Sequence, residues 1–272
     1  MTLKNYERKN GLVNPLEKKI VIFVENQSES MNADGVRGHL EAVGCSADRR
    51  SMYDKLWKRM LDIIISFLGF ILLFPLLLGI SVAIIIDDPG PIFFSQKRVG
   101  IYKKYFNLHK FRTMKMSTPH DVPTHMLENP EQYITKVGGF LRKHSLDELP
   151  QIGDILFSGK MSIIGPRPAL WNQDLLIAER DKYGANDIKP GLTGWAQING
   201  RDELEIADKA MLDGKYAREL NKGGFSAFKF DCRCFFMTFF TVLKHEGVVE
   251  GGTGKIKKEK ALDNGENENI SN

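Results

Sequence analysis

An aspartate–glutamate pair lies within the densest group of ionisable residues in the chain, LRKHSLDELPQ at residues 141–151. Asp147 and Glu148 follow a run of three basic residues, the first of which is Arg142. A carboxylate can attack phosphorus and form an acyl phosphate when cations or a divalent metal ion screen the negative charges. These residue types therefore indicate phosphate chemistry, with Asp147 as the candidate nucleophile and Glu148 orienting it or holding a metal ion.

The same segment also has a purely structural interpretation. Ser145 followed three residues later by Glu148 matches the sequence pattern of a capping box, which predicts a helix that begins at Ser145. Acidic residues favour helix starts because of the helix dipole, so an isolated Asp-Glu pair more often stabilises a helix than catalyses a reaction. The neighbouring cations favour the chemical interpretation, because a helix N-terminus beside basic residues can bind phosphate.

A stiff loop and a glycine-rich loop supply further candidates. Arg167 lies between two prolines in GPRP, where its guanidinium could hold a phosphate by two hydrogen bonds, although the tetrapeptide alone also fits a surface turn. Residues 189–201, KPGLTGWAQINGR, combine glycines with a tryptophan, amides and terminal cations, which suit a nucleotide base. Glycine-rich turns are common, so this loop alone is a weak signal. The candidates for nucleotide binding are Pro168, Gly191, Thr193, Gly194, Trp195, Gln197 and Arg201.

The elements that must position these residues include a long apolar segment. Residues 61–86 contain one charged residue near the start and Pro75 close to the middle. Their length matches one membrane-spanning helix, since about 20 apolar residues cross a bilayer. Basic residues flank both ends, Lys58 and Arg59 among them, so the positive-inside rule draws both ends to the cytoplasm. Because Pro75 can bend a helix, we expect a helix-break-helix that enters one leaflet and returns; a single kinked spanning helix is the alternative.

The rest of the chain predicts an α+β domain of short helices and a small antiparallel sheet. Residues 92–100 and 104–115 fit two strands that carry cations, of which Lys110 and Arg112 are further candidates for phosphate binding. The phenylalanine-rich residues 225–244 fit an interfacial amphipathic helix and a buried core helix about equally well. Further elements are expected as a strand at residues 19–25 and as helices near residues 134–155, 170–182 and 203–220.

Length and composition limit the domain organisation of the chain. A chain of 272 residues with one membrane segment leaves room for one globular domain. The net charge is +4, and the basic residues gather around the membrane segment, where they suit lipid headgroups and phosphorylated substrates better than nucleic acid. The three cysteines form neither an even disulfide framework nor a C-x-x-C metal pair. We divide the chain into an N-terminal extension of unknown role (1–50), a membrane hairpin (51–88), a cytoplasmic-face catalytic domain (89–249) and a disordered tail (250–272).

Over residues 52–249, the chain resembles the bacterial sugar transferase family, the monotopic polyprenyl-phosphate hexose-1-phosphate transferases or phosphoglycosyl transferases, in its small catalytic-core form. The resemblance rests on motifs that occur in a fixed order, and that order is highly specific. The motifs are KRMLDIIIS, the apolar hairpin, GPIFFSQKRVG, FRTM, LRKHSLDELPQ, MSIIGPRP, KPGLTGWAQINGR and the phenylalanine-rich C-terminal helix.

The resemblance implies a monotopic enzyme of the bacterial cytoplasmic membrane that moves a sugar 1-phosphate from a UDP-sugar to undecaprenyl phosphate and releases UMP. The product would begin a capsule, exopolysaccharide, O-antigen or other glycan. Asp147 would be the nucleophile of a ping-pong reaction that uses Mg²⁺, with Asp147 and Glu148 as metal ligands. The other residues that match family positions are Arg142 and Arg167 near the phosphate site, and Lys58, Arg59 and Pro75 at the membrane and the polyprenyl chain.

The chain departs from the usual family pattern at a few positions, and other functions stay open. A glycosyltransferase acting at the anomeric carbon would release UDP instead of UMP, and a noncatalytic membrane scaffold or regulator of polysaccharide assembly would only bind nucleotide. Glucose, galactose and N-acetylated or deoxygenated sugars all fit the sequence, as does a homodimer. The departures are Phe74, where serine is common, the pair Gly153 and Asp154, and Lys160.

Overall fold

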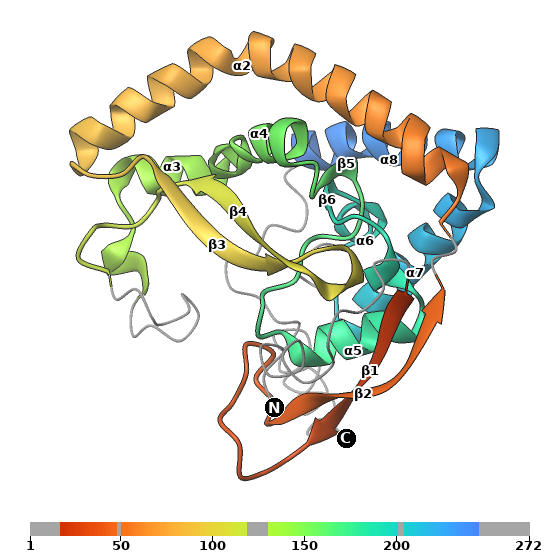
Figure 1. The fold of residues 1–272 in the computed structure, drawn as a ribbon. Coiled ribbons are helices and arrows are strands. Elements are labelled where there is room, and N and C mark those ends of the chain that lie inside the picture. Colours follow the sequence, from red (N-terminus) through yellow and green to blue (C-terminus); the bar gives the residue numbers. More distant parts are fainter. Residues whose placement is uncertain (1–16, 48–49, 119–129, 201–203, 245–272) are drawn as a thin grey trace, which may run out of the picture.

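The structure is a computed structural model that describes residues 17–47, 50–118, 130–200 and 204–244 (Figure 1). The predicted disordered tail (250–272) and the first 16 residues of the N-terminal extension lie outside these ranges. Helices and small sheets alternate along the described chain, so the mixed helix and sheet class predicted from the sequence is confirmed.

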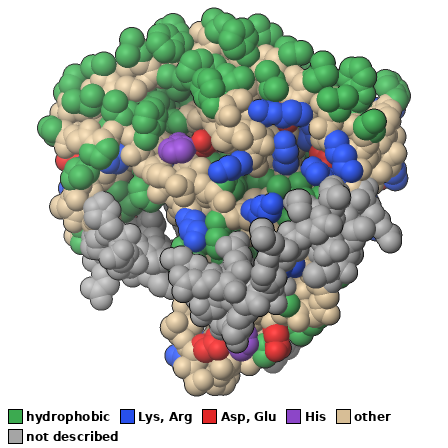
Figure 2. Space-filling model, in the orientation of Figure 1, with side chains coloured by type: hydrophobic (Ala, Val, Ile, Leu, Met, Phe, Trp, Pro, Cys, Tyr) green, Lys and Arg blue, Asp and Glu red, His purple; other side chains and the backbone are tan. Residues whose placement is uncertain are grey.

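One long helix carries the apolar segment. Helix α2 spans Lys58–Asp87 after a π-helical turn at Tyr53–Trp57, and within the described residues these together form the one helix long and apolar enough to cross a membrane. The helix continues through Pro75, so the expected interruption is absent; a proline inside a helix often kinks it without ending it. Figure 1 shows that α2 arches, with both ends directed toward the rest of the domain. Its exposed side chains contribute to an apolar band along the top of the molecule (Figure 2).

Two β-hairpins form the larger sheets. β3 (Phe93–Val99) and β4 (Tyr105–Phe111) are the two cation-bearing strands predicted from the sequence, and they pair antiparallel. β1 (Glu17–Glu25) confirms the predicted N-terminal strand. Its antiparallel partner β2 (Gly38–Ala47) follows a polar stretch in which the sequence analysis anticipated no further strand.

A short parallel pair brings the two candidate loops together. β5 (Ser162–Ile164) ends directly before GPRP, and β6 (Gly191–Thr193) lies inside the glycine-rich loop. This pair corrects the expectation of a purely antiparallel sheet. A Cβ atom on Gly191 would collide with the backbone of Gly165, so the two loops approach at a separation that glycine permits.

After α2, the helices are short except near the C-terminal end of the described chain. The helix expected near residues 134–155 is divided, because a 3-10 turn at Leu146–Glu148 and a π-helical turn at Asp154–Ser158 interrupt it. The helices are α3 (Lys136–Lys143), α4 (Gln151–Gly153), α5 (Asp174–Lys182), α6 (Trp195–Ile198), α7 (Ile206–Lys222) and α8 (Gly224–Lys244).

Helix α8 combines the two interpretations of the phenylalanine-rich segment. Ala227 and Cys234 are buried in the core that α8 shares with α7. Phe225, Phe236 and Phe240 are exposed on the surface of the same helix. An apolar outer surface of this kind suits the headgroup region of a membrane, whereas the inner face holds the domain together.

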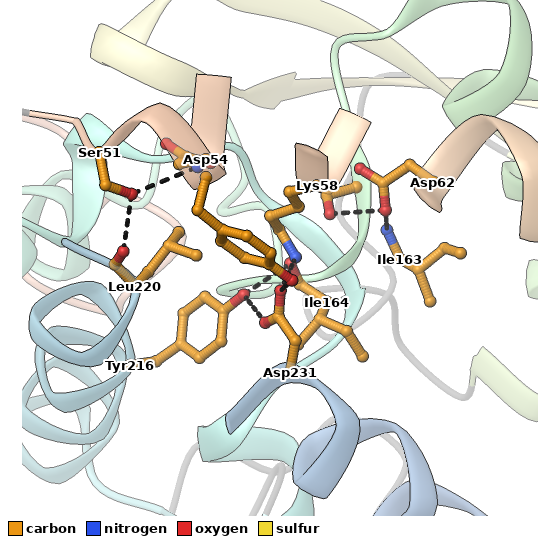
Figure 3. Close-up of polar contacts among 11 residues, drawn as sticks. Ser51, Asp54, Lys58, Asp62, Ile163, Ile164, Tyr216, Leu220 and Asp231 are labelled. Carbon is orange, nitrogen blue, oxygen red and sulfur yellow. Dashed lines mark hydrogen bonds and ion pairs between the residues drawn. The ribbon is translucent and has the colours of Figure 1, made fainter. Parts of the chain in front are cut away.

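A buried ion pair fixes the N-terminal end of α2. Lys58 Nζ lies 2.8 Å from Asp231 Oδ2 on α8. Tyr53 donates to the same oxygen at 3.0 Å, and the Tyr216 hydroxyl on α7 donates to Asp231 Oδ1 at 2.6 Å (Figure 3). The sequence predicts Lys58 at the membrane and the polyprenyl chain, but the structure buries this side chain inside the domain. Asp231 supplies the acidic partner that a buried ammonium group needs.

The same region holds β5. Asp62 Oδ1 on α2 accepts hydrogen bonds from Ser162 Oγ and from the Ile163 backbone N–H, each at 3.0 Å (Figure 3). The Tyr216 hydroxyl also lies 3.1 Å from the Ile164 carbonyl oxygen. Arg59 donates to the carbonyl oxygen of Ile155 at 2.6 Å and so ties α2 to the segment after α4.

The N-terminal hairpin docks on α5 through Asp181. Asp181 Oδ2 accepts the Val21 N–H at 2.7 Å, and Lys103 Nζ lies 2.9 and 2.8 Å from the two carboxylate oxygens. Asp34, from the turn between β1 and β2, accepts the Leu175 N–H at 2.8 Å in the first turn of α5. The hairpin is therefore part of the folded domain and not a separate appendage.

We expect Asp181→Ala to lower the free energy of unfolding by about 3 kcal/mol or more, because it removes the carboxylate that the buried Lys103 ammonium contacts. Urea unfolding of the full chain in detergent would measure the change. Glu179→Ala is the matched control on the same helix, since Glu179 pairs with the exposed Lys182, and it should cost less than about 1 kcal/mol. Equal losses for the two variants would contradict the docking role of Asp181.

Candidate active site

Three charged side chains meet where β4, the 3-10 turn and the loop after β5 come together. Glu148 Oε1 lies 2.8 Å from Lys110 Nζ and 2.5 Å from Arg167 Nη2. Arg167 Nη1 lies 3.3 Å from the second oxygen, Oε2, so the guanidinium holds both oxygens of the carboxylate. The structure thus brings together one acid and two cations that the sequence analysis proposed from separate motifs.

Asp147 lies beside this cluster and makes no hydrogen bond to the described residues. Its Oδ2 is 3.7 Å from Lys110 Nζ, and its side chain is 14% exposed. Burial raises the pKa of Asp147, and the Glu148 charge adds to the rise against the opposing effect of Lys110 and Arg167. Burial by itself would also raise the pKa of Glu148, but Arg167 and Lys110 outweigh it and hold that pKa well below the ordinary value. Glu148 is therefore the fixed anion of the cluster, and Asp147 is the carboxylate available to react.

Ser145 does not cap a helix. Its backbone is left-handed, with φ 55° and ψ 23°, and its side chain makes no capping hydrogen bond. The predicted capping box is therefore wrong, because an N-cap residue has an extended backbone and the backbone of Ser145 is left-handed. Asp147 and Glu148 lie in a single 3-10 turn, and the argument from a helix N-terminus does not apply to them.

The other two predicted phosphate-binding cations contact different partners. Arg142 Nε donates to Thr113 Oγ1 at 2.8 Å, and the charge of Arg142 also lowers the pKa of Asp147 against the effect of burial. Arg112 pairs with the Asp88 side chain and donates to the Pro91 carbonyl oxygen at 2.7 Å. Arg112 therefore joins β4 to the end of α2, and these contacts give no support to its predicted role in phosphate binding.

A recess opens beside the charged cluster. It holds about 210 Å³ of empty space, the opening to solvent included. Two polar residues on its wall, Arg98 on β3 and Gln151 on α4, were not proposed as site residues from the sequence. Alternation along β3 could have separated Arg98 from Lys97, because neighbouring strand residues face opposite sides. The lining residues are Arg98, Leu108, Glu148, Gln151, Arg167, Pro168, Gly191 and Leu192.

The glycine-rich loop contributes less to the recess than the sequence analysis proposed. Gly191 lines it, together with Pro168 from GPRP. Thr193 instead contacts α8, where its hydroxyl oxygen lies 2.9 Å from that of Thr238. Gly194 is closely packed, because a Cβ atom there would collide with the Gly165 carbonyl oxygen. Of the remaining candidates in this loop, Gln197 is buried and Arg201 lies outside the described residues.

Trp195 is a core residue in this structure. It is 5% exposed, and its ring centroid lies 4.9 Å from that of Phe230 on α8. The cationic groups of Lys215 and Arg233 lie 5.0 and 5.2 Å from its ring centroid. The predicted stacking of a nucleotide base on this indole therefore lacks an accessible ring surface, since a tryptophan beside glycines can equally fill a core.

Asp147 and Glu148 are also the predicted Mg²⁺ ligands. Among the described residues, no group of three or more His, Cys, Asp and Glu side chains could enclose a metal ion. Mg²⁺ commonly binds through one or two carboxylates together with waters and substrate phosphates. The Asp147 carboxylate, which makes no hydrogen bond to the described residues, lies beside Glu148 and fits that mode of binding. Glu148 also forms ion pairs with Lys110 and Arg167.

Comparisons with known proteins show what the chain is similar to. A family described as "Bacterial sugar transferase" matches residues 53–245. The chain is 38% identical over 200 residues to "UDP-glucose:undecaprenyl-phosphate glucose-1-phosphate transferase" of Escherichia coli K12, which covers 69% of this chain and 40% of that protein. It is 38% identical over 178 residues to "Undecaprenyl-phosphate glucose phosphotransferase" of Komagataeibacter xylinus, covering 62% of this chain and 33% of that protein.

A shorter relative matches over most of its length. The chain is 38% identical over 161 residues to "Uncharacterized sugar transferase EpsL" of Bacillus subtilis strain 168, covering 59% of this chain and 74% of that protein. The chain thus spans less than half of the two longer relatives and about three quarters of the shorter one. The N-terminal β1–β2 hairpin lies before the part that the family matches.

We expect Glu148→Gln to lower the free energy of unfolding by about 2 kcal/mol at pH 7, because it removes the charge that Lys110 and Arg167 share. The folded-state pKa of Glu148 lies below its ordinary value of 4.5, so its contribution is complete above that pH and is lost as the pH falls toward the folded-state pKa. The difference between wild type and variant should therefore shrink below about pH 4.5.

Urea unfolding at a series of pH values would measure this difference. Glu219→Gln is the control with the same charge change, since Glu219 pairs with the exposed Lys222 on α7. Its effect should stay below about 1 kcal/mol. A Glu148→Gln effect that does not change with pH would contradict the depressed pKa.

Proposed function

The chain belongs to the bacterial sugar transferase family, and we propose that it transfers a sugar 1-phosphate from a UDP-sugar to undecaprenyl phosphate. The observation that carries this proposal is the arrangement of Asp147, an available carboxylate, beside a glutamate that holds two cations at the edge of a recess. The printed names of the E. coli and Komagataeibacter relatives support the same donor and acceptor classes. Those names place glucose first among the sugars to test.

The reaction proceeds in two halves at one phosphorus atom. An Asp147 carboxylate oxygen attacks the β-phosphorus of the UDP-sugar, and the bond from that phosphorus to the bridging oxygen breaks. The electron pair leaves on the α-phosphate of UMP, and the sugar phosphate stays on Asp147 as an acyl phosphate. A phosphate oxygen of undecaprenyl phosphate then attacks the same phosphorus, and the Asp147 carboxylate is released.

The neighbouring residues have distinct parts in this scheme. Glu148 keeps Lys110 and Arg167 in place before the donor binds. Those cations then stabilise the charge that develops on the phosphoryl oxygens during both transfers. The ionised form of Asp147 is the nucleophile, so the raised pKa of this group makes activity fall as the solution becomes acidic. Asp147 and Glu148 would also hold Mg²⁺, which supplies further screening of the phosphate charges.

We also propose that the domain rests on the cytoplasmic face of the bacterial cytoplasmic membrane through a re-entrant α2. The arch of α2 brings both of its ends to the same side (Figure 1). Lys and Arg side chains lie below the apolar band of the surface (Figure 2), in the position where they meet anionic headgroups. A straight spanning helix would instead place the two ends on opposite sides of the bilayer.

We expect purified protein to release UMP from one UDP-sugar when undecaprenyl phosphate and Mg²⁺ are present. Asp147→Asn should lower that rate about 1,000-fold or more, because the amide is no longer a nucleophile. Asp208→Asn, at an exposed acid on α7, is the control and should keep the wild-type rate. Chromatography of the released nucleotide from a panel of donors headed by UDP-glucose would measure the rate.

The released nucleotide separates the alternatives. Release of UDP in place of UMP would indicate a glycosyltransferase and would contradict the proposed mechanism. Nucleotide binding without release of either product across the donor panel would favour the noncatalytic scaffold.

For the topology, we expect cysteines introduced before and after α2 to be labelled from the same side of the membrane. The variants Met52→Cys and Pro89→Cys each place a cysteine at an exposed position on one flank of α2. Leu72→Cys places one at an exposed position in the middle of the helix. In a background without native cysteines, a membrane-impermeant thiol reagent should modify both flanks in inverted vesicles and neither in intact spheroplasts. Leu72→Cys should react only after detergent is added, and labelling of one flank from each side would show a spanning helix.

A further inference from the structure

Arg98 is a cation on the wall of the recess, and its printed hydrogen bonds within the described part of the chain go to neutral acceptors. It lies near the end of β3, and it lines the recess together with Glu148 and Arg167. Its Nη1 donates to the Pro168 carbonyl oxygen at 2.9 Å, and its Nη2 donates to Gln96 Oε1 at 2.6 Å. Both acceptors are neutral, and no atom of residues 17–47, 50–118, 130–200 or 204–244 forms a hydrogen bond with the buried Nε of Arg98.

The electrostatic setting of Arg98 favours an anion in the recess. Burial, followed by the positive charge of Arg167, lowers the pKa of Arg98 to about 9, and Glu148 only partly opposes the effect. Glu148 is already bound by Lys110 and Arg167. An anion that enters the recess would therefore relieve repulsion between Arg98 and Arg167 and would supply the charged acceptor that Arg98 lacks.

We propose that Arg98 binds the phosphate group of the donor that departs with the nucleotide, next to the phosphate attacked by Asp147. This proposal rests on the proposed function and deepens it by assigning a second anion subsite. Lys110 lies beside Asp147 and, together with Arg167, holds Glu148. Arg98 lies on the adjoining wall, beside Pro168. The two phosphates of a nucleoside diphosphate are joined through one oxygen. The subsites that bind them must therefore lie side by side.

The reaction gives this subsite a catalytic part. When the bond from the β-phosphorus to the bridging oxygen breaks, the electron pair goes to the departing α-phosphate, whose negative charge increases. A guanidinium already placed against that phosphate stabilises the increase without further rearrangement. Arg98 therefore contacts the leaving group, and its effect should be larger on the dianion of UMP than on the monoanion.

We expect Arg98→Met to weaken the binding of UMP about 10- to 100-fold, as the loss of a charge-assisted hydrogen bond predicts. Isothermal titration of the full chain in detergent would measure the affinity. Lys97→Met is the matched control, because it removes the same charge from the adjacent position of β3, where Lys97 Nζ lies 3.8 Å from the centroid of the Tyr105 ring. Lys97→Met should bind UMP as wild type does, and equal binding by the two variants would overturn the subsite.

The pH dependence separates phosphate binding from a structural role of Arg98 in holding the Pro168 carbonyl. The affinity of wild type for UMP should rise as the phosphate takes its second charge, near pH 6, and Arg98→Met should flatten that rise. Arg98→Lys keeps the charge and should weaken UMP binding by less than Arg98→Met. If the lysine variant lost as much affinity as the methionine variant and both kept the wild-type rise, Arg98 would be structural and the proposal would fail.

A second probe separates this proposal from the proposed function. Inorganic phosphate that binds in an Arg98-dependent way, with no binding of UMP, would keep the anion subsite and overturn the nucleotide donor. UMP that binds wild type and Arg98→Met equally would overturn the subsite and leave the proposed function intact. Absence of binding by either probe would overturn both.

Discussion

The buried ion pair between Lys58 and Asp231 is the contact on which the arrangement of the membrane helix and the site depends. Removing either partner would leave a charge inside the domain, which is far more costly than breaking a surface pair. Asp231 also accepts from Tyr216, whose hydroxyl reaches the Ile164 carbonyl oxygen (Figure 3). Ile164 ends β5, and Arg167 follows it by three residues. One continuous set of contacts therefore positions the N-terminal end of α2 and Arg167, the cation that holds Glu148.

Adjacent carboxyl groups acquire different properties at the site because their neighbours differ. Both Asp147 and Glu148 are largely buried, and burial alone raises the pKa of each. Glu148 lies within hydrogen-bonding distance of Lys110 and Arg167, so those charges outweigh burial; Asp147 lies farther from Lys110, and burial prevails. One carboxylate thus serves as a permanent counter-ion while its neighbour keeps lone pairs that are available for reaction. This division suits the covalent transfer that we propose, in which one of two adjoining acids is the nucleophile.

The N-terminal hairpin lies before the family match, yet it packs behind the wall of the recess. Val21 and Leu40 belong to the same hydrophobic cluster as Val99 and Ala169. Val99 follows Arg98 in β3, and Ala169 follows Pro168 in the loop that lines the recess. The backbone of Val99 donates to the Ala169 carbonyl oxygen at 2.9 Å, which joins these two segments directly. The hairpin therefore supports the segments that carry Arg98 and Pro168.

The kinds of element and the candidate acids could be predicted from the sequence, because hydrophobic periodicity and clustered charge are local properties of the chain. The apolar helix, the β3–β4 hairpin and the candidacy of Asp147 and Glu148 all followed from such local patterns. The cation that contacts each acid is seen only in the folded structure, because those pairs join segments far apart in the chain. The tertiary structure placed Arg167 on Glu148, turned Trp195 into a core residue and left Arg98 facing the recess, because burial depends on the packing of distant elements.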